Sequence, residues 1–145
     1  MVRNTAFRFA PAALAVACGG GVALAPSGPH PINAQEFVEV EFPPPPAQIE
    51  EIPERLPEQD ECTWVDGHYH WRGRWVWIPG RWVVPPEDCY YAPALVEWSK
   101  TRDPKLYYSP PRWYREGAEL LPANRAICPI PRACSGTASA GVGQQ

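Results

Sequence analysis

Apolar and polar residues alternate in short runs between residues 62 and 84, and these runs are separated by glycines. Alternation over four or five residues is typical of a strand that is buried on one face. The pattern predicts four short strands at residues 62–65, 68–71, 74–78 and 81–84.

The breaks between these runs have the composition of tight turns. Asp66-Gly67 is a typical two-residue hairpin sequence, and Pro79-Gly80 suits a type II turn, in which glycine takes a positive φ. Gly73 marks a further turn. Consecutive hairpins of this length predict an antiparallel meander, because parallel strands need long crossover connections. The predicted fold class is therefore all-β, a small meander of aromatic hairpins with disordered segments at the N- and C-termini.

Strand alternation also assigns side chains to faces, since residues i and i+2 of a strand lie on the same side. Tyr69 and Trp71 share one face of their strand, and His68 and His70 share the other. In the following strands, Trp75 lies on the same face as Trp77, and Trp82 lies on the same face as Val84.

The aromatic residues belong to a repeated unit. Trp64-Val-Asp-Gly67-His-Tyr69 and Trp77-Ile-Pro-Gly80-Arg-Trp82 have the same spacing and begin 13 residues apart. The second unit, with Arg74-Trp75-Val76 before it, resembles the WxxGxW (YxWGxW) repeat proteins of bacteria. The resemblance covers residues 64–84 well and residues 106–114 weakly, where Pro111 replaces the glycine. It implies a small exported or lipoprotein-like envelope protein with no established chemistry.

Residues 1–34 have the composition of an export signal. Arg3 and Arg8 precede an apolar run, and no acidic residue occurs before Glu36. Two processing routes fit: cleavage after Ala34, or lipoprotein processing at Cys18, whose preceding residues Leu-Ala-Val-Ala resemble a lipobox. The expected location is therefore periplasmic, associated with the outer membrane or extracellular. We expect contact with the membrane only through a lipid anchor at Cys18.

The cysteine count agrees with export. Either processing route takes Cys18 out of the set of five, which leaves an even number suited to an oxidising compartment. The remaining cysteines are Cys62, Cys89, Cys128 and Cys134. They allow three pairings, of which we favour Cys62 with Cys89, clamping the two repeats, and Cys128 with Cys134, closing a small loop. No Cys-x-x-Cys spacing indicates a zinc site.

Charge and proline divide the rest of the chain. Residues 35–61 carry nine acidic groups and one basic group, a net charge of 1 − 9 = −8, and contain four consecutive prolines. This composition predicts an acidic, stiffly extended linker or stalk that joins the signal to the aromatic β module at residues 62–115. Residues 116–134 form an irregular extension that contains cysteines, and residues 135–145 form a flexible tail. The positive charge is too dilute for binding to nucleic acid.

Two clusters are candidates for binding. Five aromatic residues could form a flat platform that stacks on sugar rings, although a module this small also needs them as its core. They are Tyr69, Trp71, Trp75, Trp77 and Trp82. His68 and His70 point the same way, as a metal clamp requires, with only Asp66 and His30 as suggestions for a third ligand. The alternative is a pair of exposed polar residues.

No nucleophile motif, phosphate-binding loop or metalloprotease motif occurs, so we expect neither enzymatic activity nor a cofactor. The sequence predicts a non-catalytic structural or adhesive protein of the cell envelope, with an envelope polymer or envelope protein as its partner. The alternative is a carbohydrate-binding module for peptidoglycan or polysaccharide that uses the Trp platform.

Overall fold

A computed structural model describes residues 22–55 and 60–134 of the chain. Strands make up 36% of the described residues and helices 6%, in small antiparallel sheets of two or three strands, which confirms the all-β prediction. The predicted N- and C-terminal disorder falls largely on residues 1–21 and 135–145, which lie outside the described residues, as does Cys18.

The two repeats lie in one long, bent hairpin. Strand β2 (Thr63–Val65) pairs with β5 (Arg81–Val84), and β3 (His68–Trp71) pairs with β4 (Trp75–Ile78). The same register runs through both sheets, because Trp64 lies opposite Trp82 and Tyr69 opposite Trp77. The chain reverses at Gly73, whose φ of 73° is a conformation that glycine adopts without strain.

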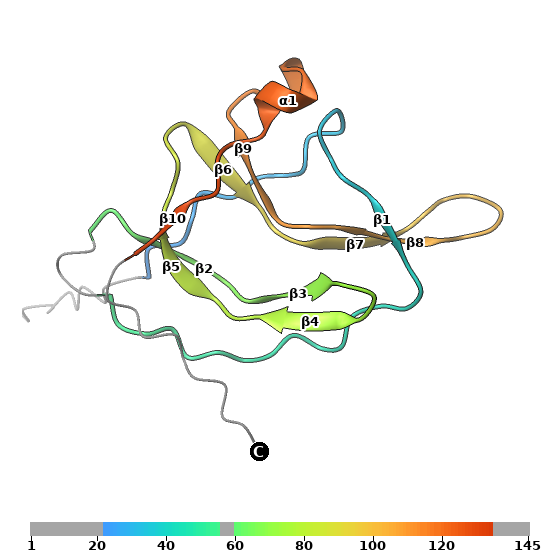
Figure 1. The fold of residues 1–145 in the computed structure, drawn as a ribbon, viewed down its shortest axis with the longest axis horizontal. Helices are drawn as coiled ribbons and strands as arrows, with labels where there is room; N and C mark the ends of the chain where they lie inside the picture. The colour runs from blue at the N-terminus through green and yellow to red at the C-terminus, as the bar shows by residue number, and fades with distance from the viewer. Residues whose placement is uncertain (1–21, 56–59, 135–145) are drawn as a thin grey trace, which may run out of the picture.

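The predicted strands are present, but the predicted meander is wrong in its pairing. Gly67, Pro79 and Gly80 are not the corners of hairpins. Instead, both strands of the hairpin continue past them and pass from one sheet to the next (Figure 1). Among the described glycines, positive φ occurs at Gly73 and Gly117 and not at Gly67 or Gly80. A single reversal at Gly73 is favoured because it sets aromatic side chains directly opposite one another across the strands.

A second bent hairpin repeats this design. Strand β6 (Cys89–Ala92) pairs with β9 (Arg112–Arg115), and β7 (Leu95–Trp98) pairs with β8 (Leu106–Ser109), again in one continuous register. The breaks in this hairpin fall at prolines, which have no N–H to donate to a strand ladder. The weak third copy of the repeat is therefore β8, Pro110-Pro111 and β9, with a change of sheet where Pro111 replaces glycine.

Shorter elements extend the two hairpins. Strand β1 (Val38–Val40) adds to β8, and β10 (Arg132–Ala133) adds to β5. A 3₁₀ turn, η2 (Ala118–Leu120), and one turn of helix, α1 (Ala123–Ala126), lie beyond the end of β9 (Figure 1). The linker and the extension predicted around the aromatic module thus both contribute strands to its sheets.

Residues 22–34 connect the two hairpins. The backbone N–H groups of Ala25 and Trp64 donate to Trp64 O and Ala23 O at 3.2 and 2.8 Å. In the second hairpin, Tyr91 N–H donates to Pro26 O at 2.7 Å, and Gly28 N–H donates to Tyr91 O at 3.0 Å. This part of the predicted export signal therefore pairs with both β2 and β6.

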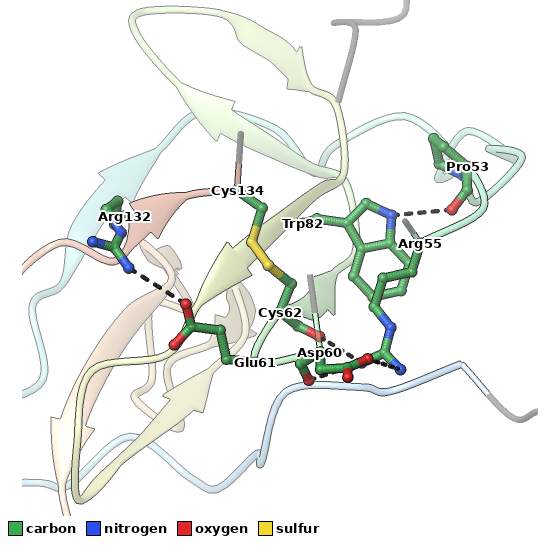
Figure 2. The surroundings of a disulfide bond; sticks show 8 residues. All are labelled: Pro53, Arg55, Asp60, Glu61, Cys62, Trp82, Arg132 and Cys134. Carbon is green, nitrogen blue, oxygen red and sulfur yellow. Dashed lines mark hydrogen bonds and ion pairs between the residues drawn. A yellow bond between two sulfur atoms is a disulfide. The ribbon is translucent and has the colours of Figure 1, made fainter. Parts of the chain in front are cut away.

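The disulfides join Cys62 to Cys134 and Cys89 to Cys128, so the favoured pairing of Cys62 with Cys89 and Cys128 with Cys134 is wrong. The cause is the position of the extension. Because β10 pairs with β5, the extension brings Cys134 beside Cys62 at the start of β2 (Figure 2). The backbone N–H of Cys128 donates to Trp113 O at 2.9 Å, which sets its side chain beside β6.

Candidate functional site: the repeat pair and its two faces

The two copies of the repeat are antiparallel partners, and each glycine accommodates an aromatic ring of the other copy. A Cβ atom built on Gly67 would overlap the ring of Trp77, and one on Gly80 would overlap the ring of Trp64. In both positions it would also meet the carboxylate of Glu50. The glycines are therefore needed for close approach, and not for the positive φ that the turn prediction assumed.

The break at each glycine also decides which face the aromatic residues occupy. Trp77 and Trp82 are five residues apart and would lie on opposite faces of a regular strand. In the structure both indole N–H groups reach the same stretch of the linker: Trp77 donates to Glu50 and Trp82 donates to Pro53 O. The spacing of the repeat therefore works only with an interruption of the strand between its two aromatic residues.

The carboxylate of Glu50 lies between the two copies. Its Oε2 accepts hydrogen bonds from Gly67 N–H at 3.2 Å and from Gly80 N–H at 2.9 Å. Its Oε1 accepts one from Trp77 Nε1–H at 2.9 Å. We call these three donors the carboxylate clamp. Hydrogen bonds to an ionised acceptor are about twice as strong as neutral ones, so the clamp is a strong point of attachment for the linker.

The rest of the linker follows the aromatic face on either side of Glu50. Trp75 Nε1–H donates to Phe42 O at 2.9 Å, and the Phe42 ring contacts Trp71 edge-on at 5.3 Å between centroids. Trp82 Nε1–H donates to Pro53 O at 3.0 Å (Figure 2). Proline-rich chain leaves its carbonyl groups without internal partners, which suits it to a row of indole donors. The prediction of a free stalk is thus wrong for residues 42–53.

The Trp residues do not form the predicted flat platform. The Tyr69 and Trp77 rings meet at 71°, the Trp71 and Trp75 rings at 65°, and both pairs are edge to face. Four of the five predicted platform residues are half-buried: Tyr69, Trp71, Trp75 and Trp77. The fifth, Trp82, is buried, with 2% of its surface exposed. Edge-to-face contacts of this kind stabilise an aromatic cluster but leave no pair of coplanar rings for a sugar to stack on.

Enlarging either glycine of the repeat is expected to open the clamp. We predict that Gly67→Ala and Gly80→Ala each lower the free energy of unfolding by about 2–3 kcal/mol, because the new methyl group displaces an indole and the Glu50 carboxylate. Urea unfolding followed by Trp fluorescence measures the loss. Gly73→Asn is the control, since Asn tolerates the left-handed conformation and a Cβ there meets nothing within 4 Å. An equal loss in all three variants would contradict this role.

The opposite face of β3 borders a cavity. Both predicted metal ligands, His68 and His70, line it, as the strand alternation predicted for a common face. His70 Nδ1 is 2.9 Å from the hydroxyl of Tyr108. Within residues 22–55 and 60–134, no group of three or more His, Cys, Asp or Glu side chains is placed to hold a metal ion.

The two residues suggested as a third metal ligand are engaged elsewhere. His30 Nε2–H donates to Pro93 O at 2.7 Å, and its Nδ1 is 3.2 Å from the Tyr114 hydroxyl. Asp66 Oδ1 accepts a hydrogen bond from Trp64 Nε1–H at 2.8 Å. The structure therefore brings His68 and His70 together at one cavity without assembling a metal site around them.

The histidines are expected to make stability depend on pH. Burial lowers the pKa of His68 below its ordinary value of 6.5, and the charges of His70 and Arg81 lower it further. A hydrogen bond to the backbone of Asp66 raises the pKa and offsets part of this shift. Burial also lowers the pKa of His70. As the pH decreases below about 6.5, the histidines of the unfolded chain bind protons more readily than those of the folded chain. Protonation therefore favours the unfolded chain, and the free energy of unfolding falls. Urea unfolding at pH 7.5 and 5.5 tests this, and His68→Gln should reduce the difference.

Sequence reasoning identified the aromatic residues and the histidines but missed Glu50. The signal in the sequence that could have found it was the number of indole N–H donors in the module. Indole N–H groups at half-buried positions need acceptors, and the predicted module contained few side-chain acceptors near its Trp residues. The acidic linker before the module is the richest source of acceptors in the chain.

No protein-family model, curated protein or solved structure matches this chain. The resemblance to the WxxGxW proteins therefore stays a prediction that rests on the repeat itself. Within the described part of the chain, no helix has the length and apolar character needed to cross a membrane.

Proposed function

We propose that this chain is a non-catalytic protein of the bacterial cell envelope with a structural or adhesive role. The observation that carries the proposal is that the aromatic face is occupied by the chain's own proline-rich segment, residues 42–53, through three indole N–H groups and the Glu50 carboxylate. The most distinctive residues of the sequence are thus used to hold the fold together. That use favours a rigid scaffold over a catalytic surface.

Two disulfides are compatible with an exported protein, since such bonds persist in oxidising compartments and are rare in the cytosol. The finer location within the envelope is part of the proposal: the periplasm, the outer membrane or the cell surface. The partner we propose is an envelope polymer or an envelope protein. The edge-to-face ring geometry supports a structural role for the Trp residues over the alternative of sugar stacking.

The contacts of residues 22–34 distinguish the two routes by which the export signal could be processed. Cleavage after Ala34 would remove the backbone partners of Trp64 and Tyr91, whereas lipoprotein processing at Cys18 would keep them. We therefore propose that the mature chain retains residues 22–34. This favours the lipid-anchored form among the two routes.

A truncation tests that part of the proposal. A chain beginning at Gln35 is expected to lose about 2–4 kcal/mol of unfolding free energy relative to one beginning at Val22. It lacks the four backbone hydrogen bonds of residues 23–28, worth about 0.5–1 kcal/mol each. Both chains carry the same added Met and are compared by urea unfolding. Equal stability of the two chains would remove the argument against cleavage after Ala34.

The function itself is tested by co-sedimentation of the intact oxidised protein with peptidoglycan sacculi and with outer-membrane vesicles, alongside acrylamide quenching of Trp fluorescence. A structural or adhesive role predicts sedimentation with one envelope fraction, no soluble fragments released from it, and little change in quenching. Strong quenching of the free protein that is relieved by soluble glycan fragments would support the carbohydrate-binding alternative. Sedimentation with neither fraction would contradict the proposal.

A further inference from the structure

The cavity beside His68 and His70 lies between the two bent hairpins and has a volume of about 470 Å³. One wall comes from β3, the end of β4 and the start of β5, and the other from residues 110–113 and 127–131. Apolar side chains contribute to both walls, Ile78 to the first and Ile127 and Ile130 to the second. A largely apolar cavity of this size with a few polar groups is typical of a binding site for a small molecule.

The charged groups around this cavity are mostly positive. Arg72, Arg81 and Arg112 line it against one carboxylate, that of Asp66, which gives 3 − 1 = +2 with the histidines neutral. Asp66 already accepts the indole N–H of Trp64, and Arg112 forms an ion pair with Glu36. Among the described residues, no carboxylate lies within 4 Å of the guanidinium groups of Arg72 or Arg81.

We propose that the cavity binds a small organic anion, with its oxyanion group held by Arg81 and its apolar body against Ile78 and Ile127. Guanidinium groups match the geometry of carboxylate and phosphate oxygens, and the hydrogen bonds they form to these groups are strengthened by charge. His68 and His70 border the same space and can donate a further hydrogen bond. Burial, and after it the positive charge of Arg81 beside His68 and of Arg72 beside His70, lowers the pKa of the two imidazoles, and a bound anion would offset the effect of those charges. This site is independent of the structural or adhesive role.

The test is an NMR titration of the intact oxidised protein, read from the imidazole C2–H resonances of His68 and His70. The probes are phenyl phosphate, benzoate, benzyl alcohol and inorganic phosphate. We expect saturable shifts with phenyl phosphate or benzoate, none with benzyl alcohol, and weaker binding of inorganic phosphate. No saturable shift with either aromatic anion would overturn the proposal. Inorganic phosphate binding as tightly as phenyl phosphate would overturn the assignment of the apolar body to the cavity.

Matched arginine variants test which positive charge holds the anion. Arg81→Gln is expected to weaken binding of the aromatic anion roughly tenfold, which corresponds to the loss of one charged hydrogen bond. Arg74→Gln is the control, because Arg74 follows Gly73 on the same hairpin but does not line the cavity. Both side chains are exposed, so the fold should survive, and urea unfolding verifies this. Equal weakening in Arg74→Gln would indicate attraction by overall charge and overturn the site.

Discussion

Replacing Cys62 and Cys134 together by alanine is expected to lower the free energy of unfolding by about 4 kcal/mol, and replacing Cys89 and Cys128 by a similar amount. The bonds close loops with sequence separations of 72 and 39 residues, and loops of these lengths give about 3–5 kcal/mol through the lost entropy of the unfolded chain. Urea unfolding of each double variant under oxidising conditions measures the loss. The described strands form four short sheets of two or three strands each, so this loss is a large fraction of the total stability.

Peptide mapping tests the disulfide pairing in the same proteins. Non-reducing peptide mapping of the wild-type protein should give one peptide pair joined through Cys62 and Cys134 and another through Cys89 and Cys128. Each double variant should keep the other bond. A bond between Cys62 and Cys89 would contradict the fold, because Cys62 directly precedes β2 of the first hairpin and Cys89 begins β6 of the second.

Replacing Glu50 by alanine is expected to lower the free energy of unfolding by about 3–4 kcal/mol. The substitution removes the acceptor from Gly67 N–H, Gly80 N–H and Trp77 Nε1–H at once. A hydrogen bond to a charged group contributes about 1.5–3 kcal/mol, but these donors are only half-buried and water can replace part of what is lost. Glu50→Gln keeps an acceptor oxygen, and its loss should be smaller, about 1–2 kcal/mol. Urea unfolding measures both variants.

Glu51→Ala is the control for Glu50→Ala, because it removes the same charge from an exposed neighbouring residue. We expect a change within about 0.5 kcal/mol for this control. Acetate should partly restore the stability of Glu50→Ala, since it can occupy the space left by the carboxylate, and should not restore Gly67→Ala. If the Glu50 and Glu51 variants were equally stable, the clamp would contribute nothing to the fold.

The positions and faces of the strands followed from the sequence, whereas their partners did not. Alternation with a period of two is local, so it placed the runs near Trp64, Tyr69, Trp77 and Trp82 correctly. Pairing depends on which break reverses the chain, and three breaks were each compatible with a turn. The structure uses only Gly73, because one long hairpin buries Trp64 against Trp82 and leaves room at the glycines for the rings of the opposite copy.

The candidate site was predictable in part for the same reason. The aromatic set and the histidine pair are visible as periodic patterns on adjacent strands, and the structure does place the histidines on one cavity. The partner of the aromatic face was not predictable, since Glu50 lies 27 residues before Trp77 in a linker without periodicity. The disulfide pairing failed similarly, because it depends on where the chain beyond residue 115 returns to the sheets.

The spacing of the repeat acquires a physical meaning in this arrangement. Two copies side by side and antiparallel present two backbone N–H groups and an indole N–H to a single carboxylate. One copy alone supplies neither the second glycine nor the ring that covers the first. A protein built on this unit therefore needs its copies in pairs and an acidic residue nearby to fill the clamp.

The central claim is that the chain's own acidic, proline-rich segment occupies the aromatic face, and NMR of the indole N–H groups tests it most directly. We expect nuclear Overhauser contacts from the indole protons of Trp75, Trp77 and Trp82 to residues Phe42, Glu50 and Pro53, respectively. We also expect that the Trp77 indole resonance shifts in Glu50→Gln. Indole protons that exchange freely with water and show no contact to residues 42–53 would contradict the claim.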